Sequence, residues 1–218
     1  MSFLDEQWDD LLPTYLTNTT KDRLKEALGQ FKTKDKGSIN YDQFFKDWHK
    51  DYFLQGDLIV ELRVPIWNLM KLSFDKAYIN AIILSNTCDI SFGNKREINS
   101  KQCLFAPLID LDDHIEELKA LGYDDKRATQ FRDDVRSQML SNIFYLPGID
   151  GKAKEQIALF DQIFWFPISE MKSLIETIDE ERITSLNYFG YYLFILKLSY
   201  HFCRLPEQCD REITGFNN

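Results

Sequence analysis

The sequence predicts an α+β domain, and three observations support that prediction. Apolar residues recur every three or four positions through residues 1–53, as in amphipathic helices. From Gly56 the pattern changes to short β-rich runs bounded by Gly, Pro and Asn, and residues 183–205 are apolar on most sides of a helix. With 218 residues, of which 44% are hydrophobic and 14% aromatic, the chain can bury one substantial core.

Residues 1–53 are predicted to form a helical segment that packs on this core. The three-four spacing places helices at residues 4–15, 18–31 and 44–52. Asn18 or Thr19 can cap the second helix, because a short polar side chain can accept hydrogen bonds from the first free N–H groups.

The loop between the second and third predicted helices has a calcium-site look-alike. Residues 32–43 place a glycine and an isoleucine as an EF-hand loop does. Calcium needs oxygen ligands at alternate positions of such a loop, and Lys32, Lys34 and Lys36 stand there instead. We therefore interpret the segment as a plain turn without metal.

Residues 54–218 are predicted to form the β domain. Strands are expected at residues 57–64, 81–84 and 103–109, and the second of these is short and fully apolar, as buried strands are. Pro65 is expected to end the first strand because proline lacks an N–H donor. Residues 68–80 are then interpreted as a long connection.

A helical insertion is predicted at residues 110–142, where two amphipathic helices carry charges on their outer faces. Strands resume at residues 142–146 and 157–166, separated by a turn rich in Pro and Gly. Residues 183–205 form the expected C-terminal helix, which must be covered by the strands, by the N-terminal helices or by another subunit.

Charge narrows the classes of function. The formal net charge is -9 and the pI is about 4.9, which disfavours binding to the phosphates of RNA or DNA. The N-terminal residues lack the basic and apolar regions of a signal peptide, and no apolar stretch is long enough to span a membrane. We expect a cytoplasmic protein with no membrane partner.

The four cysteines are expected to be free thiols, because no export signal is present and a chain of this size does not need disulfides. They contain no C-x2-C pair, so a structural zinc site is not predicted. The sequence predicts no cofactor.

The densest group of reactive side chains lies at the end of the second predicted strand and comprises Ser85, Cys88 and Asp89. Asp57, at the start of the preceding strand, is expected to lie at the same end of the sheet, because the start of one strand lies beside the end of its antiparallel neighbour. We expect Asp57, Ser85 and Asp89 to converge there.

Two interpretations of Cys88 follow from its neighbours. As a nucleophile it would need a base, and His114 and His201 are the candidates. As a structural residue it would be a small buried hydrophobe, with Asp89 bonded to the backbone of the turn.

Three short segments resemble the MazF and PemK toxin family. Gly56 and Asp57 match the pair that opens the first strand in that family, Leu84 and Ser85 match the end of a later strand, and an Asp-Gln pair ending in Gln162 matches a third. The resemblance implies a small SH3-like antiparallel β-barrel, here with N-terminal helices, the helical insertion and the buried C-terminal helix added.

The family's catalytic pattern is not carried over. Those toxins are ribonucleases that use an Arg in the loop before the Leu-Ser strand and a hydroxyl residue after a later strand. Here that loop offers Lys71 and Lys76 and no Arg, and the strand ending at Asp110 is followed by no Ser or Thr.

The sequence therefore predicts a non-catalytic protein-interaction module, which the resemblance places in a bacterial stress, toxin-antitoxin or phage-defence system. Its partner is expected to be another protein, and a homo-oligomer is left open. The alternative is a related endoribonuclease with a relocated active site. The candidate catalytic residues are Ser85, Cys88, Asp89 and Arg63, and the candidate binding residues are Asp57, Asn86 and Gln162.

Overall fold

The computed structural model describes residues 16–30, 39–47, 52–68, 70–90, 102–149, 153–171 and 183–203. It is a mixed α and β structure built on one eight-stranded antiparallel sheet. The strands are β1 (Phe45–Asp47), β2 (Leu58–Asn68), β3 (Ser73–Ile83), β4 (Gln102–Asp110), β5 (Ile143–Leu146), β6 (Gln156–Leu159), β7 (Phe164–Pro167) and β8 (Ile183–Leu186). The helices include α2 (Asn18–Gln30), α3 (Thr87–Ile90), α4 (Leu111–Ala120), α5 (Asp125–Arg136) and α7 (Tyr188–Cys203).

The sheet is open. Its strand order is β1-β8-β2-β3-β4-β6-β5, and β7 pairs with the first half of β4. Within the described strands no pairing joins β5 to β1, so the closed SH3-like barrel expected from the family resemblance is not found. The coarser expectation of an α+β fold with added helices is confirmed.

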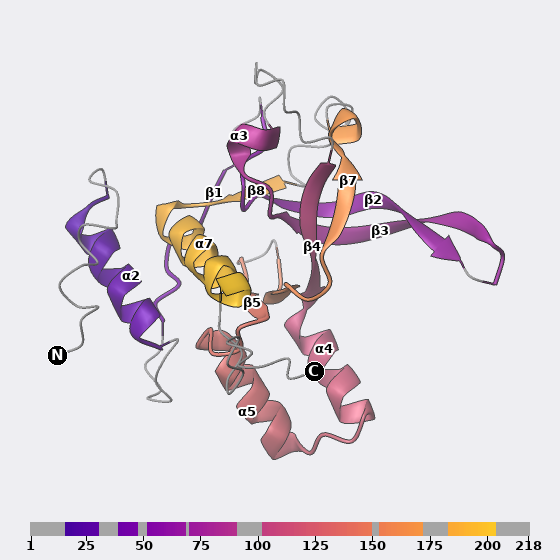
Figure 1. Cartoon of the computed structure of the whole chain (residues 1–218). Coiled ribbons are helices and arrows are strands. Elements are labelled where there is room, and N and C mark those ends of the chain that lie inside the picture. The colour runs from indigo at the N-terminus through magenta and orange to yellow at the C-terminus, as the bar shows by residue number, and fades with distance from the viewer. Residues whose placement is uncertain are drawn as a thin grey trace, which may run out of the picture.

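Both faces of the sheet are covered. Ile82 of β3 and Leu108 of β4 face α7, whereas Ile83 and Phe105 belong to a second apolar cluster on the opposite face. The helical insertion packs at one end over a third cluster that includes Ile157. Figure 1 shows α7 lying across the sheet with α4 and α5 grouped at one end. Strands buried on both faces carry continuous apolar runs, which explains residues 81–84.

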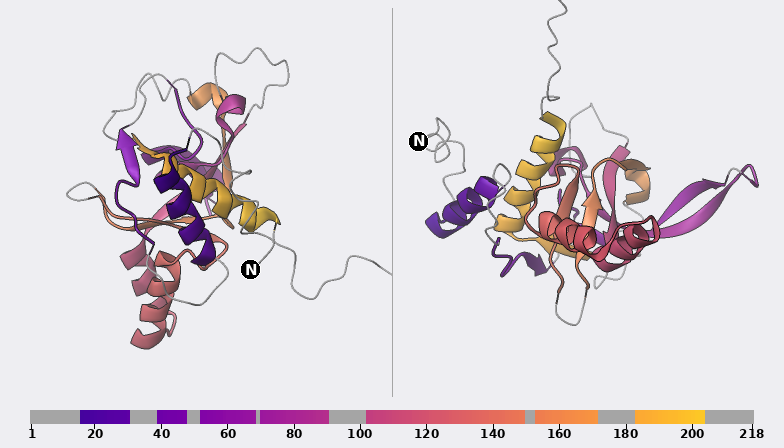
Figure 2. Two further views of the ribbon diagram at one scale, coloured as in Figure 1. Left: turned by 90° about the vertical axis from the view of Figure 1, so that its left-hand side faces the viewer. Right: turned by 90° about the horizontal axis from the view of Figure 1, so that it is seen from below.

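The predicted buried C-terminal helix is confirmed, but it starts later than expected. Residues 183–186 form β8 instead of the first turn of the helix. Asn187 then caps α7, because its Oδ1 accepts a hydrogen bond from the Gly190 N–H at 2.8 Å. A Cβ on Gly190 would lie 2.8 Å from the carbonyl oxygen of Phe44. This glycine therefore allows α7 to approach the start of β1. The helix α2 packs against α7 on the side away from the sheet (Figure 2).

The N-terminal region contains a strand where a third helix was predicted. The second predicted helix is confirmed as α2, whereas residues 45–47 form β1 and pair with β8, Phe45 lying opposite Leu186. Phe44 is buried in the apolar cluster that also contains Phe189 and Leu193 of α7. This packing outweighs the helix-like spacing of the apolar residues in 44–52. The first predicted helix and most of the EF-hand-like loop lie outside the described residues.

The largest difference from the sequence prediction is the hairpin of β2 and β3. Pro65 does not end β2, and residues 73–80, predicted as part of a connection, belong to β3. Pro65 is tolerated because β2 pairs with β8 only at Leu58 and Ile59, so beyond that point β2 has one described neighbour and half of its N–H groups are not needed. The hairpin projects from the body of the sheet (Figures 1 and 2).

A β-bulge marks the base of this projection. Ile59 pairs with Ala81 and Leu62 with Ile79, so Val60 and Glu61 together face Asn80. Glu61 has a left-handed φ of 54°, and its N–H donates to the Asn80 Oδ1 at 3.0 Å. The extra residue puts Ile59 and Leu62 on the same face of the strand, and both are buried in one cluster. We call residues 62–79 beyond the bulge the arm.

The other differences are smaller. The run predicted at residues 157–166 is two strands, β6 and β7, separated by a turn, and β7 pairs with β4. The helical insertion is confirmed as α4 and α5, and the strands predicted at residues 103–109 and 142–146 are confirmed as β4 and β5. Cys88, Cys103 and Cys203 are free thiols, as predicted.

A buried lysine joins α7 to the helical insertion. Lys197 is only 1% exposed, and its Nζ donates to the carbonyl oxygen of Gln138. Gln138 is itself buried, and its side chain pairs with both backbone groups of Tyr145 on β5. Burial lowers the pKa of Lys197 to about 7, because the apolar surroundings disfavour the ammonium form.

The bulge geometry predicts that glycine is tolerated at residue 61 at least as well as alanine, the reverse of the usual order within a strand. We expect Glu61→Gly to be at least as stable as Glu61→Ala, by up to about 1 kcal/mol, because a left-handed φ strains residues that carry a Cβ. Urea unfolding of the two variants measures the difference. At Arg63, on the regular part of β2, the Ala variant should be the more stable, and the same order at both positions would contradict the strain argument.

Lys197 predicts a pH dependence of stability. Its pKa is lowered in the folded protein, so between about pH 7 and the pKa of the unfolded lysine the unfolded chain binds more protons, and this group makes stability rise with pH. Lys197→Met should remove that contribution. The difference in unfolding free energy between variant and wild type should then change by on the order of 1 kcal/mol per pH unit above pH 7. A constant difference would show that Lys197 does not titrate in this range.

Candidate functional site

The sequence-predicted site lies where the start of β2 meets the end of β3. The Gly56 N–H donates to the Ile83 carbonyl at 2.8 Å, and the Ile83 N–H donates to the Asp57 carbonyl at 2.9 Å. Gly56 has a φ of +88°, and a Cβ there would lie 3.1 Å from Leu186 Cδ1. Glycine therefore satisfies both a conformational and a steric requirement of this junction.

Asp57 is a buried carboxylate with structural partners. It is 1% exposed, its Oδ1 accepts from the Ser185 hydroxyl at 2.7 Å, and its Oδ2 accepts from the Leu54 N–H at 2.8 Å. These contacts tie β8 to the turn that precedes β2. A carboxylate that satisfies two buried donors holds strands together.

Ser85 is engaged by β4. Its Oγ accepts a hydrogen bond from the Leu104 N–H at 2.9 Å. Burial raises the pKa of Cys103 to about 12, and the nearby Ser85 side chain, which lowers that pKa, opposes this only in part. Neither side chain is prepared to act as a nucleophile near neutral pH.

Asn86 organises the turn that carries Cys88 and Asp89. Its Oδ1 accepts from the Cys88 N–H at 2.9 Å, and its carbonyl oxygen accepts from the Asp89 N–H at 2.9 Å. The side chain that hydrogen-bonds to the backbone of this turn is therefore Asn86, whereas Asp89 was the residue predicted to do so. Cys88 is exposed, which contradicts the structural interpretation of it as a buried hydrophobe.

The histidines considered as bases for Cys88 contact other groups. The His114 ring on α4 lies 5.5 Å from the Phe131 ring, and its Nδ1 is 3.5 Å from Glu117 Oε2. The His201 ring on α7 lies 5.7 Å from the Phe160 ring. None of these contacts is to Cys88, so they give no support for a Cys-His pair.

The remaining candidates are dispersed. Arg63 lies opposite Tyr78, seven residues before Ser85, which corresponds to roughly 20 Å along the strand. Gln162 is exposed in the turn between β6 and β7, where its N–H donates to the Leu159 carbonyl. Asp57 and Ser85 lie at the same end of the sheet, but their side chains bind Ser185 and Leu104, and Asp89 is exposed. Among the described residues, no three His, Cys, Asp or Glu side chains are grouped to hold a metal ion.

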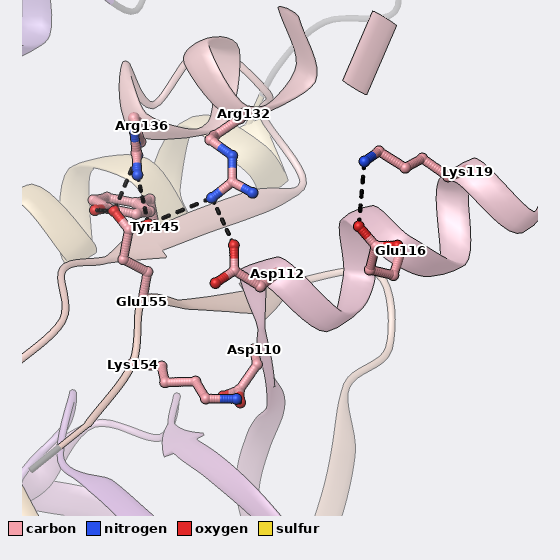
Figure 3. Close-up of polar contacts among 9 residues, drawn as sticks. All are labelled: Asp110, Asp112, Glu116, Lys119, Arg132, Arg136, Tyr145, Lys154 and Glu155. Atoms are coloured by element: carbon pink, nitrogen blue, oxygen red, sulfur yellow. Dashed lines mark hydrogen bonds and ion pairs between the residues drawn. The ribbon is translucent and has the colours of Figure 1, made fainter. Parts of the chain in front are cut away.

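A polar network that sequence analysis did not anticipate joins α4 and α5 to the sheet (Figure 3). Glu155 is its centre: Arg136 donates to its two carboxylate oxygens at 3.0 and 2.6 Å, and the Tyr145 hydroxyl donates to Oε1. Arg132 lies 3.7 Å from Glu155 and 2.7 Å from Asp112 of α4. Charged residues of the insertion helices therefore form specific contacts with one another and with Glu155, and we call this network the clasp.

The electrostatics of this clasp favour a structural role. Burial alone would raise the pKa of Glu155, but the bonds from Arg136 and Tyr145 outweigh it and lower that pKa, so the carboxylate stays ionised. Burial raises the pKa of the Tyr145 hydroxyl, and the bond to Glu155 raises it further. A tyrosine held neutral beside a paired carboxylate is suited to positioning the helices.

The arm carries three large apolar or aromatic side chains that are highly exposed. Met70 and Leu72 at its tip are 94% and 73% exposed, and Tyr78 is 64% exposed. Tyr78 lies opposite Arg63 in the register, and Pro65 lies opposite Lys76, so these four residues share the outer face of the arm. The aromatic and β-branched content of residues 73–83 was the sequence signal for a strand here.

The chain matches no protein-family model and no curated protein sequence. None of the helices in the described part of the chain is both long and apolar enough to cross a membrane.

The buried contacts of Asp57 predict a stability role. Asp57→Ala should lower the free energy of unfolding by about 2 to 4 kcal/mol, because it leaves the buried Ser185 hydroxyl and the half-buried Leu54 N–H without an acceptor. Chemical denaturation measures the loss. Asp89→Ala, on an exposed position, should change stability by less than about 0.5 kcal/mol, and equal losses for both variants would refute the assignment.

Proposed function

We propose that the protein is a non-catalytic protein-interaction module that docks through the arm. The observation that carries this proposal is the exposure of Met70, Leu72 and Tyr78 on a hairpin that extends beyond the packed sheet. Large apolar and aromatic side chains at an exposed site gain free energy when a partner covers them.

The arm differs in charge from the rest of the chain. Residues 62–79 carry three basic side chains and one acidic side chain, whereas the whole chain has a net charge of -9. Depletion of charge and enrichment in Met, Tyr and Arg are the compositional signs of interface cores. The predicted nucleophile Ser85 supports the same conclusion, because its Oγ accepts a hydrogen bond from the Leu104 N–H of β4.

We extend the proposal to the setting. The three short matches to the MazF and PemK toxins support a role in a bacterial stress, toxin-antitoxin or phage-defence system, and they support descent of the β2, β3 and β4 meander from an SH3-like barrel. A toxin-like chain that lacks the catalytic Arg and hydroxyl would retain partner binding. The proposed partner is another protein of that system, and binding takes place in the cytoplasm.

The alternative is an endoribonuclease with a relocated active site. Arg63 and Lys76 flank Tyr78 on the outer face of the arm, and cations beside an aromatic ring are what single-stranded nucleic acids bind. The arm, residues 62–79, contains no histidine to move a proton near neutral pH. The protein-binding proposal is therefore the better supported.

The double variant Leu72→Ser with Tyr78→Ser tests the proposal. Tagged full-length protein purified from its native cells should recover its partner, identified by mass spectrometry, and the variant should recover at least about tenfold less, because two interface anchors are lost. The matched control is Leu121→Ser with Tyr188→Ser, whose side chains are 81% and 64% exposed but lie off the arm.

Equal recovery by the arm and control variants would contradict docking through the arm. Cleavage of RNA by the purified wild-type protein, abolished by Arg63→Ala, would instead establish the endoribonuclease.

A further inference from the structure

The arm has two strand edges with no described neighbour. Pairing between β2 and β8 stops at Ile59, and pairing between β3 and β4 covers only Asn80 to Ile83. Along residues 62–68 and 73–79, therefore, β2 and β3 pair only with each other among the strands that the structure describes. Unpaired edges are templates for an added strand.

The β2 edge is blocked and the β3 edge is not. Pro65 lacks an N–H, and the bulge at Val60 and Glu61 distorts the strand at its base. Proline and bulges are two of the features by which proteins prevent pairing at an edge. Residues 73–79 contain no proline and no bulge, so their edge is regular.

The direction of the backbone groups on β3 follows from two hydrogen bonds. The Ile83 N–H points toward the β2 side, where it binds Asp57, and the Leu84 N–H points toward β4, where it binds Leu104. Because these directions alternate along a strand, the N–H and C=O groups of Lys76 and Tyr78 point to the free edge. The edge thus offers donors and acceptors in strand register.

Side chains along this edge differ between the two faces. On the outer face, Lys76 and Tyr78 stand next to Pro65 and Arg63. Neither Arg63 nor Lys76 has an ion-pair partner among the described residues, and Asp75 is paired with Lys71 at 3.0 Å. On the inner face, Ala77 and Ile79 are half-buried beside Val64 and Leu62.

We infer that the free edge of β3, residues 73–79, binds an extended segment of a partner protein as an added strand, and that this segment alternates acidic with aliphatic residues. The acidic residues lie on the outer face beside Lys76 and Arg63, and the aliphatic residues extend the inner face beside Ala77 and Ile79. The inference rests on the proposed docking through the arm and specifies how the partner is held.

Two synthetic peptides test the partner chemistry. One alternates glutamate with valine and the other lysine with valine, and each is titrated into the isotope-labelled full-length protein while backbone amide shifts are followed by NMR. The acidic peptide should shift the Lys76 and Tyr78 amides and slow their hydrogen exchange at least about tenfold, because these N–H groups become bonded. The basic peptide should bind at least about tenfold more weakly.

Substitutions at Lys76 separate backbone from side-chain recognition. Lys76→Ala keeps the edge N–H and loses only an exposed charge, so affinity for the acidic peptide should fall by about two- to fivefold. Lys76→Pro also removes the N–H, which points away from β2, and should cost about a further tenfold. The exchange measurement on the wild-type protein requires no variant, so a misfolded Lys76→Pro does not remove the test.

Several results would overturn the inference. They are failure of the acidic peptide to bind, equal affinities of the Ala and Pro variants, preferential binding of an oligouridylate that displaces the peptide, and a concentration-dependent doubling of mass that excludes the peptide. If the native partner is lost from the Leu72 and Tyr78 variant but is recovered equally by Lys76→Ala and Lys76→Pro, docking through the arm stands and strand addition fails.

Discussion

The two-for-one pairing of Val60 and Glu61 with Asn80 is the constraint on which the rest of the sheet depends. A strand that kept strict alternation would turn Leu62 and Val64 away from the cluster that buries Ile59. The extra residue in the bulge shifts the alternation by one position. Side chains before and after the bulge, Ile59 on one side and Leu62 and Val64 on the other, therefore point to the same apolar cluster. It also coincides with the end of pairing to β8, and beyond it β2 and β3 continue as a two-stranded ribbon.

The body of the protein is stabilised from both faces of the sheet, and polar residues fix how the layers meet. Asp57 joins β8 to the start of β2, Gln138 joins the end of α5 to β5, and Glu155 joins both insertion helices to the sheet. Each satisfies more than one donor or acceptor in a buried or half-buried place. Such contacts select one arrangement of apolar layers that would otherwise pack in several ways.

Much of the fold follows from the sequence where period and length are unambiguous. The helices α4 and α5, the strand β4 and the buried core of α7 could be predicted because their apolar spacing has only one interpretation. β1 could not, because Phe44 and Phe45 suit a helix as well as a strand until β8 is present to pair with them. Pro65 misled for a related reason: whether proline ends a strand depends on neighbours that the sequence does not show. Of the candidate site, the meeting of Gly56 and Asp57 with Ile83 was predictable, but the burial of Asp57 against Ser185, distant in sequence, was not.

Pro65 also has a bearing on stoichiometry. It lies on β2 directly opposite Lys76, so the ribbon is closed to hydrogen bonding on one side at the point where it is open on the other. A ribbon that accepts strands on both sides can grow without limit, as fibrils do. A ribbon with a single accepting side pairs directly with one added strand. The same proline that the sheet tolerates would therefore limit direct pairing with this arm to one added strand.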